Sequence, residues 1–126
     1  MLKRRAEEMP GKAMEMDGVR DVSMRLMIGR GDGAPTFSMR HFTVAPGGHT
    51  PRHQHNYEHE VFVVGGTGTV EHEGKFEEVR AGDVLFIEPG ATHQFRNEGE
   101  EPLKFLCLVP AQFDCGDGTT APTPGS

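Results

Sequence analysis

The sequence predicts an all-β domain, built as a sandwich or a barrel of short strands. Short apolar segments alternate with turn residues along most of the chain, and no segment keeps a helical period over several turns. Seventeen glycines and nine prolines among 126 residues provide the many turns that such a fold needs. The length suits one compact domain with its own hydrophobic core.

The predicted strands follow one another with only turns or short loops between them. They cover residues 22–28, 36–45, 60–64, 68–73, 76–79, 84–87, 92–97 and 103–109. A turn at Pro46-Gly47-Gly48 is expected to end the second strand, and Glu73-Gly74-Lys75 reads as a hairpin turn. We therefore divide the chain into an N-terminal arm (residues 1–20), the barrel domain (21–113) and a tail (114–126) that is expected to be disordered, because it has little to bury.

Charge and hydropathy exclude several classes of partner. The net charge of -6 gives no basic surface for nucleic acid and no attraction to an anionic membrane. Apolar runs are only a few residues long, far short of a spanning helix, and no apolar segment follows the basic start as in a secretory signal. We expect a cytoplasmic protein whose two cysteines, Cys107 and Cys115, remain reduced.

Histidines and glutamates gather in one short segment, from His53 to Glu60. His53 and His55 are two residues apart, so on a strand they share a face. His59 has the same parity, because it is an even number of residues from both, and would share that face if the strand is regular. His93 follows a Pro-Gly turn and lies in the predicted strand 92–97, which could bring it to the same point. Imidazole is the commonest protein ligand for transition metals, so the pattern predicts a metal site.

Either His59 or Glu60 could be the third ligand of this segment, and the residues alone leave the choice open. Glu60 has the opposite parity to His59, but one bulged residue in the intervening segment would exchange the two. Four neutral imidazoles would leave the metal's positive charge intact and favour anionic substrates, whereas Glu60 as ligand would cancel one charge. The alternative to a metal site is that these are ordinary surface histidines in a polar loop.

Two motifs in this chain resemble those of the cupin superfamily. Gly47, His53, His55 and Glu60 match the first motif in order, and Gly82, Gly90, His93 and Asn97 match the second, although Glu88 stands where that motif has proline. The resemblance implies a double-stranded β-helix, or jelly-roll, barrel. The chain also resembles small single-domain bacterial cupins with four histidine ligands, including manganese-binding ones. This resemblance implies His53, His55, His59 and His93 as ligands, with manganese as the first choice of metal and iron, zinc or nickel as others.

Strand parity also predicts the walls of the pocket. Lys104 should face water, so Phe105, Cys107 and Val109 take the inner face, and Phe95 shares the parity of His93. Cys107 is then either a small buried residue or a thiol near the metal. Arg40 shares parity with Phe42 and could hold a substrate carboxylate, or it could lie on the outer surface.

The resemblance favours an enzyme, with a small-molecule substrate. The leading expectation is a small dioxygenase-like oxidoreductase, because a four-histidine octahedral site leaves two positions open and no general base stands out beyond the ligands. A non-redox isomerase or lyase, or a cupin that binds a small ligand without turnover, remains as an alternative. We also expect a homodimer, because cupins commonly pair and residues 22–28 have apolar side chains on both faces.

Overall fold

A computed structural model describes residues 1–113 of the chain, and the predicted tail lies outside this range. Its strands are β1 (Lys12–Ala13), β2 (Arg20–Ile28), β3 (Phe37–His49), β4 (His59–Gly65), β5 (Thr67–His72), β6 (Lys75–Arg80), β7 (Val84–Ile87), β8 (His93–Arg96) and β9 (Leu103–Pro110). Short 3-10 helices, η1 (Ala6–Glu8), η2 (Arg30–Asp32) and η3 (Ala111–Phe113), complete the described chain. All the predicted strands are present, and among residues 1–113 no helix is long and apolar enough to cross a membrane.

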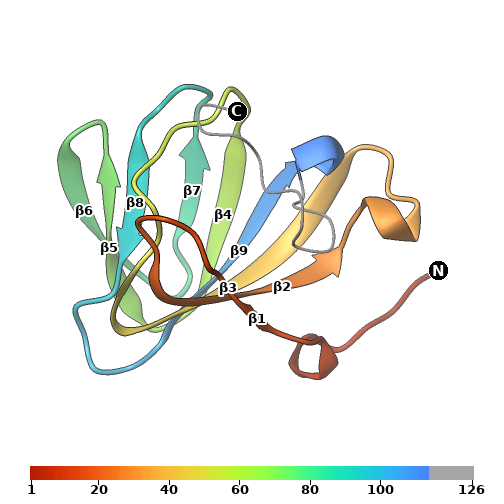
Figure 1. Cartoon of the computed structure of the whole chain (residues 1–126), viewed down its shortest axis with the longest axis horizontal. Coiled ribbons are helices and arrows are strands. Elements are labelled where there is room, and N and C mark those ends of the chain that lie inside the picture. The colour runs from red at the N-terminus through yellow and green to blue at the C-terminus, as the bar shows by residue number, and fades with distance from the viewer. Residues whose placement is uncertain (114–126) are drawn as a thin grey trace.

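The strands form one antiparallel sheet that curls on itself (Figure 1). Its order is β6-β5-β8-β3-β9-β4-β7, with β2 pairing β3 and β1 pairing β2. Consecutive strands often lie apart in this order, as when β9 lies between β3 and β4, so the chain crosses repeatedly between the two halves of the curled sheet. The all-β jelly-roll barrel predicted from the sequence is therefore confirmed.

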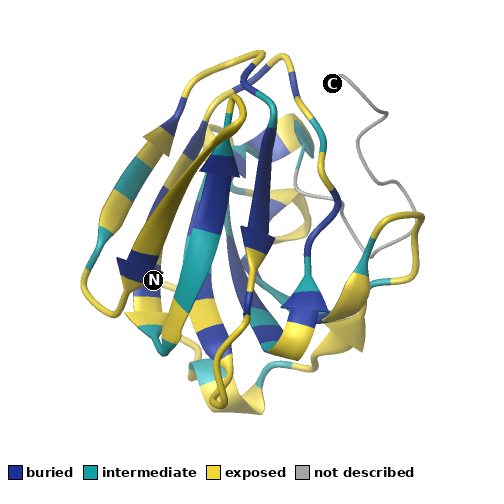
Figure 2. Cartoon of the chain, turned by 90° about the vertical axis from the view of Figure 1, so that its left-hand side faces the viewer, coloured by how far each residue is buried: buried dark blue, intermediate teal, exposed yellow. Residues whose placement is uncertain are grey.

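Side chains alternate between the core and the surface along the central strands (Figure 2). On β4 the odd-numbered Val61 and Val63 are almost fully buried, and on β9 Lys104 is exposed between the buried Leu103 and Phe105. This is the pattern of strands with one face in a core and one face outward. The predicted parity of both strands is confirmed.

The second strand differs from its prediction, because β3 continues through Pro46-Gly47-Gly48 to His49. Gly47 adopts a φ of +82° and donates its N–H to the carbonyl of Asn97 at 2.8 Å. A Cβ atom on Gly48 would lie 2.6 Å from the carbonyl oxygen of Arg20, so only glycine fits beside β2. The glycines therefore bend the strand instead of ending it.

The N-terminal arm is attached to the barrel by specific contacts. Arg4 makes two hydrogen bonds with the carboxylate of Asp32, at 2.7 and 2.8 Å, and donates a third to the carbonyl of Met27. Further along the arm, β1 pairs with β2, and the N–H of Met14 donates to the carbonyl of Val22 at 2.8 Å. These contacts hold the arm against β2 and the loop that follows it.

Candidate metal centre

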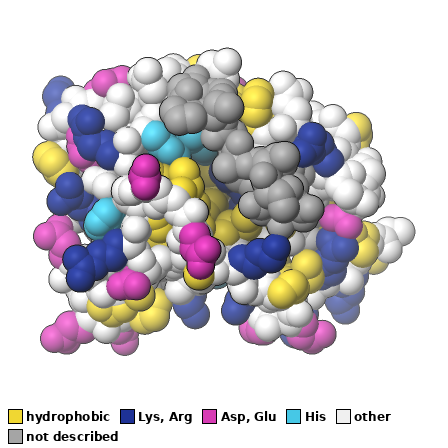
Figure 3. Space-filling view, viewed as in Figure 1, with side chains coloured by type: hydrophobic (Ala, Val, Ile, Leu, Met, Phe, Trp, Pro, Cys, Tyr) yellow, Lys and Arg dark blue, Asp and Glu magenta, His cyan; other side chains and the backbone are white. Residues whose placement is uncertain are grey.

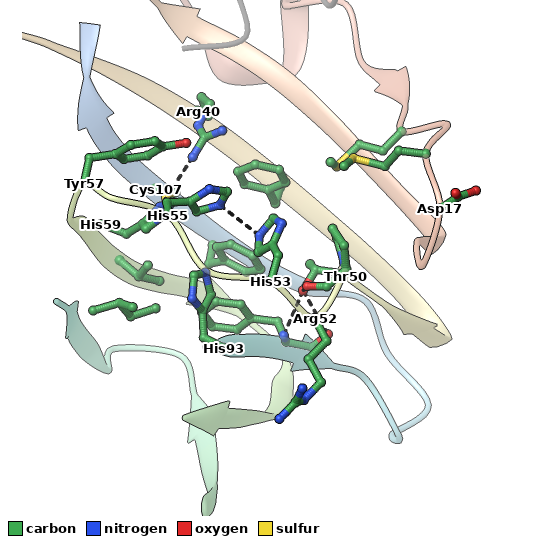
Figure 4. A pocket seen from close by; sticks show the side chains of 18 residues that line it. Asp17, Arg40, Thr50, Arg52, His53, His55, Tyr57, His59, His93 and Cys107 are labelled. Atoms are coloured by element: carbon green, nitrogen blue, oxygen red, sulfur yellow. Dashed lines mark hydrogen bonds between the residues drawn. The ribbon is translucent and has the colours of Figure 1, made fainter. Parts of the chain in front are cut away.

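Three of the predicted ligands lie together inside the barrel. His53, His55 and His93 each offer a ring nitrogen, and these atoms lie within 4.8 Å of one another. His53 and His93 come from distant parts of the chain, and two backbone hydrogen bonds between them, of 3.2 and 3.0 Å, fix their relative position. The three imidazoles point toward a common region of the cavity in Figure 4. This arrangement can hold one metal ion.

The fourth predicted ligand, His59, lies beside this group but does not belong to it. Its ring centroid is 4.9 Å from that of His55 and 5.1 Å from that of His93. The side chain is buried, and its Nε2 atom has no hydrogen-bond partner within residues 1–113. A buried polar atom without a partner is costly, and a ligand in the cavity would remove that cost. Glu60, its competitor, is exposed on the outer side of β4.

Contacts of the Nδ1 atoms of two rings are compatible with the tautomer that a metal needs, in which Nε2 carries the lone pair. The Nδ1 atom of His93 lies 2.9 Å from the carbonyl of Ala91, to which it donates a proton, so Nε2 keeps its lone pair. The Nδ1 atom of His59 lies 3.2 Å from the Sγ atom of Cys107, which allows the same tautomer. Between His53 and His55, the two Nε2 atoms are 3.0 Å apart, so a proton or a cation must separate their lone pairs.

The surroundings lower the pKa values of His53, His59 and His93 and so favour their neutral forms. Burial is the main cause that lowers the pKa of His53 to about 3, and the neighbouring His55 and His93 add to it. For His59, burial and then the charge of Arg40 lower the pKa to about 2. The pKa of His93 is also lowered, mainly by burial. Neutral imidazoles at neutral pH are ready to bind a metal ion without first losing a proton. The residues present therefore fit a divalent metal ion.

The histidines line a cavity of about 460 Å³. Its wall is largely apolar and aromatic, and includes Phe42, Tyr57, Val61, Ile87, Phe95 and Phe105. Figure 3 shows histidine side chains at the edge of this hollow, with hydrophobic side chains inside it. The predicted pocket residues Phe95 and Phe105 stack on each other with ring centroids 4.4 Å apart. Val109, predicted beside them, is buried in the core and is not among the residues that line the cavity.

Arg40 and Cys107 form a buried polar contact in the cavity wall. Both are buried, and Arg40 donates an Nη2 hydrogen bond to the Sγ atom of Cys107 at 3.3 Å. The guanidinium of Arg40 also lies 5.0 Å from the ring centroid of Phe42. Arg40 is therefore inside the barrel, and the outer-surface alternative is wrong. Cys107 lies next to a predicted ligand, whereas Cys115 lies outside the described residues.

Several residues that line the cavity were not predicted from the sequence. Tyr57 is buried between two rings, stacked on His55 at 4.8 Å and on Phe113 at 4.0 Å. Its parity matches that of the histidines, so the same argument applied to position 57 would have found it. The arm contributes Met14, Met16 and Asp17, and no signal in the sequence placed them at the cavity. In Figure 4, Asp17 lies on the opposite side of the pocket from the imidazoles.

A jelly-roll barrel with inward histidines from two separated motifs defines the class of small β-barrel proteins with a candidate metal site. The sequence matches the Cupin domain family over residues 40–109, which is more than half of the chain, so the chain belongs to this family. The family assignment and the fold thus agree, and they leave the particular activity open.

Two curated relatives differ in what they do. The chain is 35% identical over 79 residues to the 1-methylthio-D-xylulose 5-phosphate methylsulfurylase of Rhodospirillum rubrum, a match that covers 63% of this chain and 51% of the relative. It is 34% identical over 65 residues to the oxalate-binding protein of Thermotoga maritima, covering 51% of this chain and 54% of the relative. The chain thus spans about half the length of these relatives.

A solved structure matches more of the chain. The polyketide cyclase RemF from Streptomyces resistomycificus has a TM-score of 0.83 and 32% sequence identity. The match covers 88% of this chain and 80% of the cyclase. Similarity at this level extends beyond the two motifs to most of the barrel.

Proposed function

We propose that this chain is a metal-dependent cupin that acts on a small organic anion, with His53, His55, His59 and His93 as the ligands of one divalent ion. Manganese is the first choice, and iron, zinc and nickel are the others. The convergence of three imidazoles in a cavity of about 460 Å³ carries the proposal. The buried, unpartnered Nε2 atom of His59 supports it as the fourth ligand.

The cavity favours an anionic substrate with an aromatic or otherwise apolar body. Neutral imidazoles leave the charge of a bound metal uncancelled, and the buried Arg40 adds a second positive charge in the cavity wall. Its guanidinium has the geometry to bind a carboxylate or an enolate through two hydrogen bonds. The stacked rings of Phe95 and Phe105 provide a flat apolar surface for the remainder of the molecule.

The first candidate reaction is a non-redox one, as in an isomerase, lyase or cyclase. A bound divalent ion would act as a Lewis acid on a substrate carbonyl. The residues of this chain would hold the substrate anion through Arg40, orient its carbon skeleton against the aromatic wall and exclude water from the apolar interior. The similarity to a polyketide cyclase over most of the barrel supports this choice.

The second candidate is the dioxygenase-like oxidoreductase expected from the sequence. An all-imidazole ligand set suits manganese and iron as well as zinc, and in the described residues no carboxylate belongs to the histidine group. The cavity lies open beside the ligands, so oxygen and an organic substrate could both reach them.

One experiment separates the candidates. The protein is prepared metal-free and reloaded with zinc, manganese or iron(II), and each form is incubated with phenolic and β-dicarbonyl carboxylates, with and without oxygen. A non-redox enzyme converts its substrate without oxygen and in the zinc form. An oxidoreductase works only with manganese or iron, and it consumes oxygen in proportion to product.

The variants His53→Ala and Arg40→Gln provide the matched comparison. Loss of metal in His53→Ala and weaker substrate binding in Arg40→Gln, with its metal retained, are the expected results. Saturable binding without any product in all three metal forms would instead identify a binding protein, and would overturn the proposed catalysis. Absence of metal binding in the wild-type chain would overturn the whole proposal.

A further inference from the structure

The N-terminal arm supplies one side of the cavity. Met14, Met16 and Asp17 line it together with the histidines. Met14 is partly buried and packs against the hydrophobic core, whereas Met16 is 41% exposed. In Figure 4, Asp17 marks the position of the arm, across the cavity from the labelled imidazoles. The arm therefore forms the side of the cavity that faces the candidate metal centre.

Backbone contacts hold this part of the arm at both ends. Directly before Met14, β1 pairs with β2, and the N–H of Met14 donates to a carbonyl of β2 at 2.8 Å. After Met16 the chain turns, and the N–H of Val19 donates to the carbonyl of Met16 at 3.2 Å. Gly18 has a φ of +83° in this turn, and a Cβ atom there would lie 3.7 Å from Pro51. The turn thus lies against the segment that leads into the candidate metal centre.

Three phenylalanines of the cavity form a row of nearly parallel rings. Phe105 stacks on Phe42 with ring centroids 5.2 Å apart and an interplanar angle of 20°. It also stacks on Phe95, at 4.4 Å and 23°. All three residues line the cavity. We call them the phenylalanine row, and its planar surface suits a ligand whose own rings are planar.

Methionine side chains are well suited to complete such a site. The unbranched thioether adapts to the shape of a ligand, and its sulfur atom makes favourable contacts with aromatic rings. The exposed part of Met16 is apolar surface that a bound ligand would remove from water. Two methionines on one segment of the cavity wall therefore favour a ligand that carries aromatic rings.

A ligand must be extended to contact the arm and the candidate metal centre at the same time. The cavity of about 460 Å³ lies within the range of about 300–1,000 Å³ that is typical of sites for drug-sized molecules. A small anion such as oxalate would fill only the part beside the imidazoles and Arg40. Met14 and Met16, across the cavity, would then make no contact with it.

We propose that Met14 and Met16 determine which substrates this cavity accepts, by holding the distal ring of a planar aromatic anion within the cavity beside the phenylalanine row. The anionic end of the ligand lies at the metal ion and Arg40, so this inference rests on the proposed function. It adds that the preferred substrate is an aromatic acid with more than one ring. The arm, and not the histidine motifs, makes this selection.

Two probes with the same metal-binding group test this inference. Salicylate carries a carboxylate and an adjacent hydroxyl on one ring, and 1-hydroxy-2-naphthoate carries the same pair on two fused rings. Isothermal titration calorimetry of the zinc-loaded full chain measures the affinity for each probe. We expect the two-ring probe to bind at least about fivefold tighter, because its second ring covers apolar surface that salicylate does not reach.

Substitutions on the arm should change this ratio of affinities. Met14→Ala and Met16→Ala should each lower it at least about threefold, because each removes apolar contact with the second ring. Met16→Leu keeps an apolar side chain of similar volume and should stay within about twofold of the wild type. Met9→Ala is the matched control, because Met9 is partly buried on the same arm and is not among the residues that line the cavity.

Zinc affinity and salicylate affinity should be the same in all these variants, and circular dichroism confirms that each is folded. If Met14→Ala does not fold, the more exposed Met16 decides the question through Met16→Ala. A wild type that binds zinc and salicylate without preferring the two-ring probe would overturn this inference alone. So would a preference that Met16→Ala retains in full. If the wild-type chain binds no zinc, the proposed function fails and this inference fails with it.

Discussion

The Nδ1 atom of His59 lies 3.2 Å from the Sγ atom of Cys107, at the point where β4 runs beside β9. Arg40 donates to the same sulfur atom from β3 at 3.3 Å. Histidines that bind metals usually make a hydrogen bond through their other ring nitrogen, which fixes both the tautomer and the direction of the ring. Cys107 therefore has the position of a residue that orients a ligand.

We expect Cys107→Ala to weaken metal binding by about 10- to 100-fold, the usual effect of removing such an outer partner. Cys107→Ser retains an acceptor for Nδ1 and should stay within a few-fold of the wild type. Competition against a chromogenic chelator, with zinc as the metal, measures the affinities.

Val109→Ala is the matched control for these variants, because Val109 is buried on the same face of β9 and does not line the cavity. It should lower stability and leave zinc affinity unchanged. Equal affinity in the wild type and in Cys107→Ala would show that the sulfur atom has no positioning role.

Substitution of His59 and substitution of its neighbour Glu60 are expected to affect the metal content differently. His59→Ala should lose most of its metal after expression in minimal medium, because it removes a buried imidazole beside the other three. Glu60→Ala should keep its metal, because its side chain points out of the barrel. Elemental analysis by mass spectrometry gives the number of ions per chain. The reverse pattern would make Glu60 the ligand.

The sequence predicted best the strands that have one buried and one exposed face. Alternation along β4 and β9 placed His59 and Cys107 inward and Glu60 outward, because successive side chains on a strand must point to opposite sides. The same rule kept its register from His53 through Tyr57, although most of that segment lies outside regular strands. Local geometry was sufficient there, so the histidine group could be anticipated.

Contacts between distant segments were not predictable in the same way. Parity put Val109 on the inner face, but whether an inward side chain reaches the cavity depends on its position along the barrel. The arm residues Met14 and Met16 reach the cavity because Arg4 and β1 attach the arm to the barrel, and no periodic pattern records this attachment. Gly47 was expected to end a strand. Instead β3 continues through it, and its N–H donates a hydrogen bond to the carbonyl of the distant Asn97.

Asn97 is expected to stabilise the fold without affecting the metal. It is 1% exposed, donates from Nδ2 to the carbonyls of Val44 and Glu101 at 2.9 and 2.7 Å, and accepts from the N–H of Gly99 at 3.0 Å. Asn97→Ala leaves these groups without their partner, and each such buried group costs about 1–3 kcal/mol. Urea denaturation should show that the free energy of unfolding falls by at least about 2 kcal/mol.

Metal content of the Asn97→Ala variant at low temperature should equal that of the wild type, because the side chain bonds only to backbone groups away from the histidines. A variant that unfolds normally but loses its metal would assign this motif residue to the site instead of the fold.

Acid should destabilise the metal-free protein well above the pH at which carboxylates titrate. The pKa of His53 is about 3 in the folded chain, against an ordinary value of 6.5, so between these limits the unfolded chain binds more protons than the folded one. The free energy of unfolding therefore falls as the pH drops below about 6.5, and the loss continues down to about pH 3. Melting temperatures of metal-free protein, recorded from about pH 7.5 to about pH 4, should fall more steeply for the wild type than for His53→Gln, which cannot take up this proton. Parallel curves for the two proteins would show that His53 is not held neutral by its surroundings.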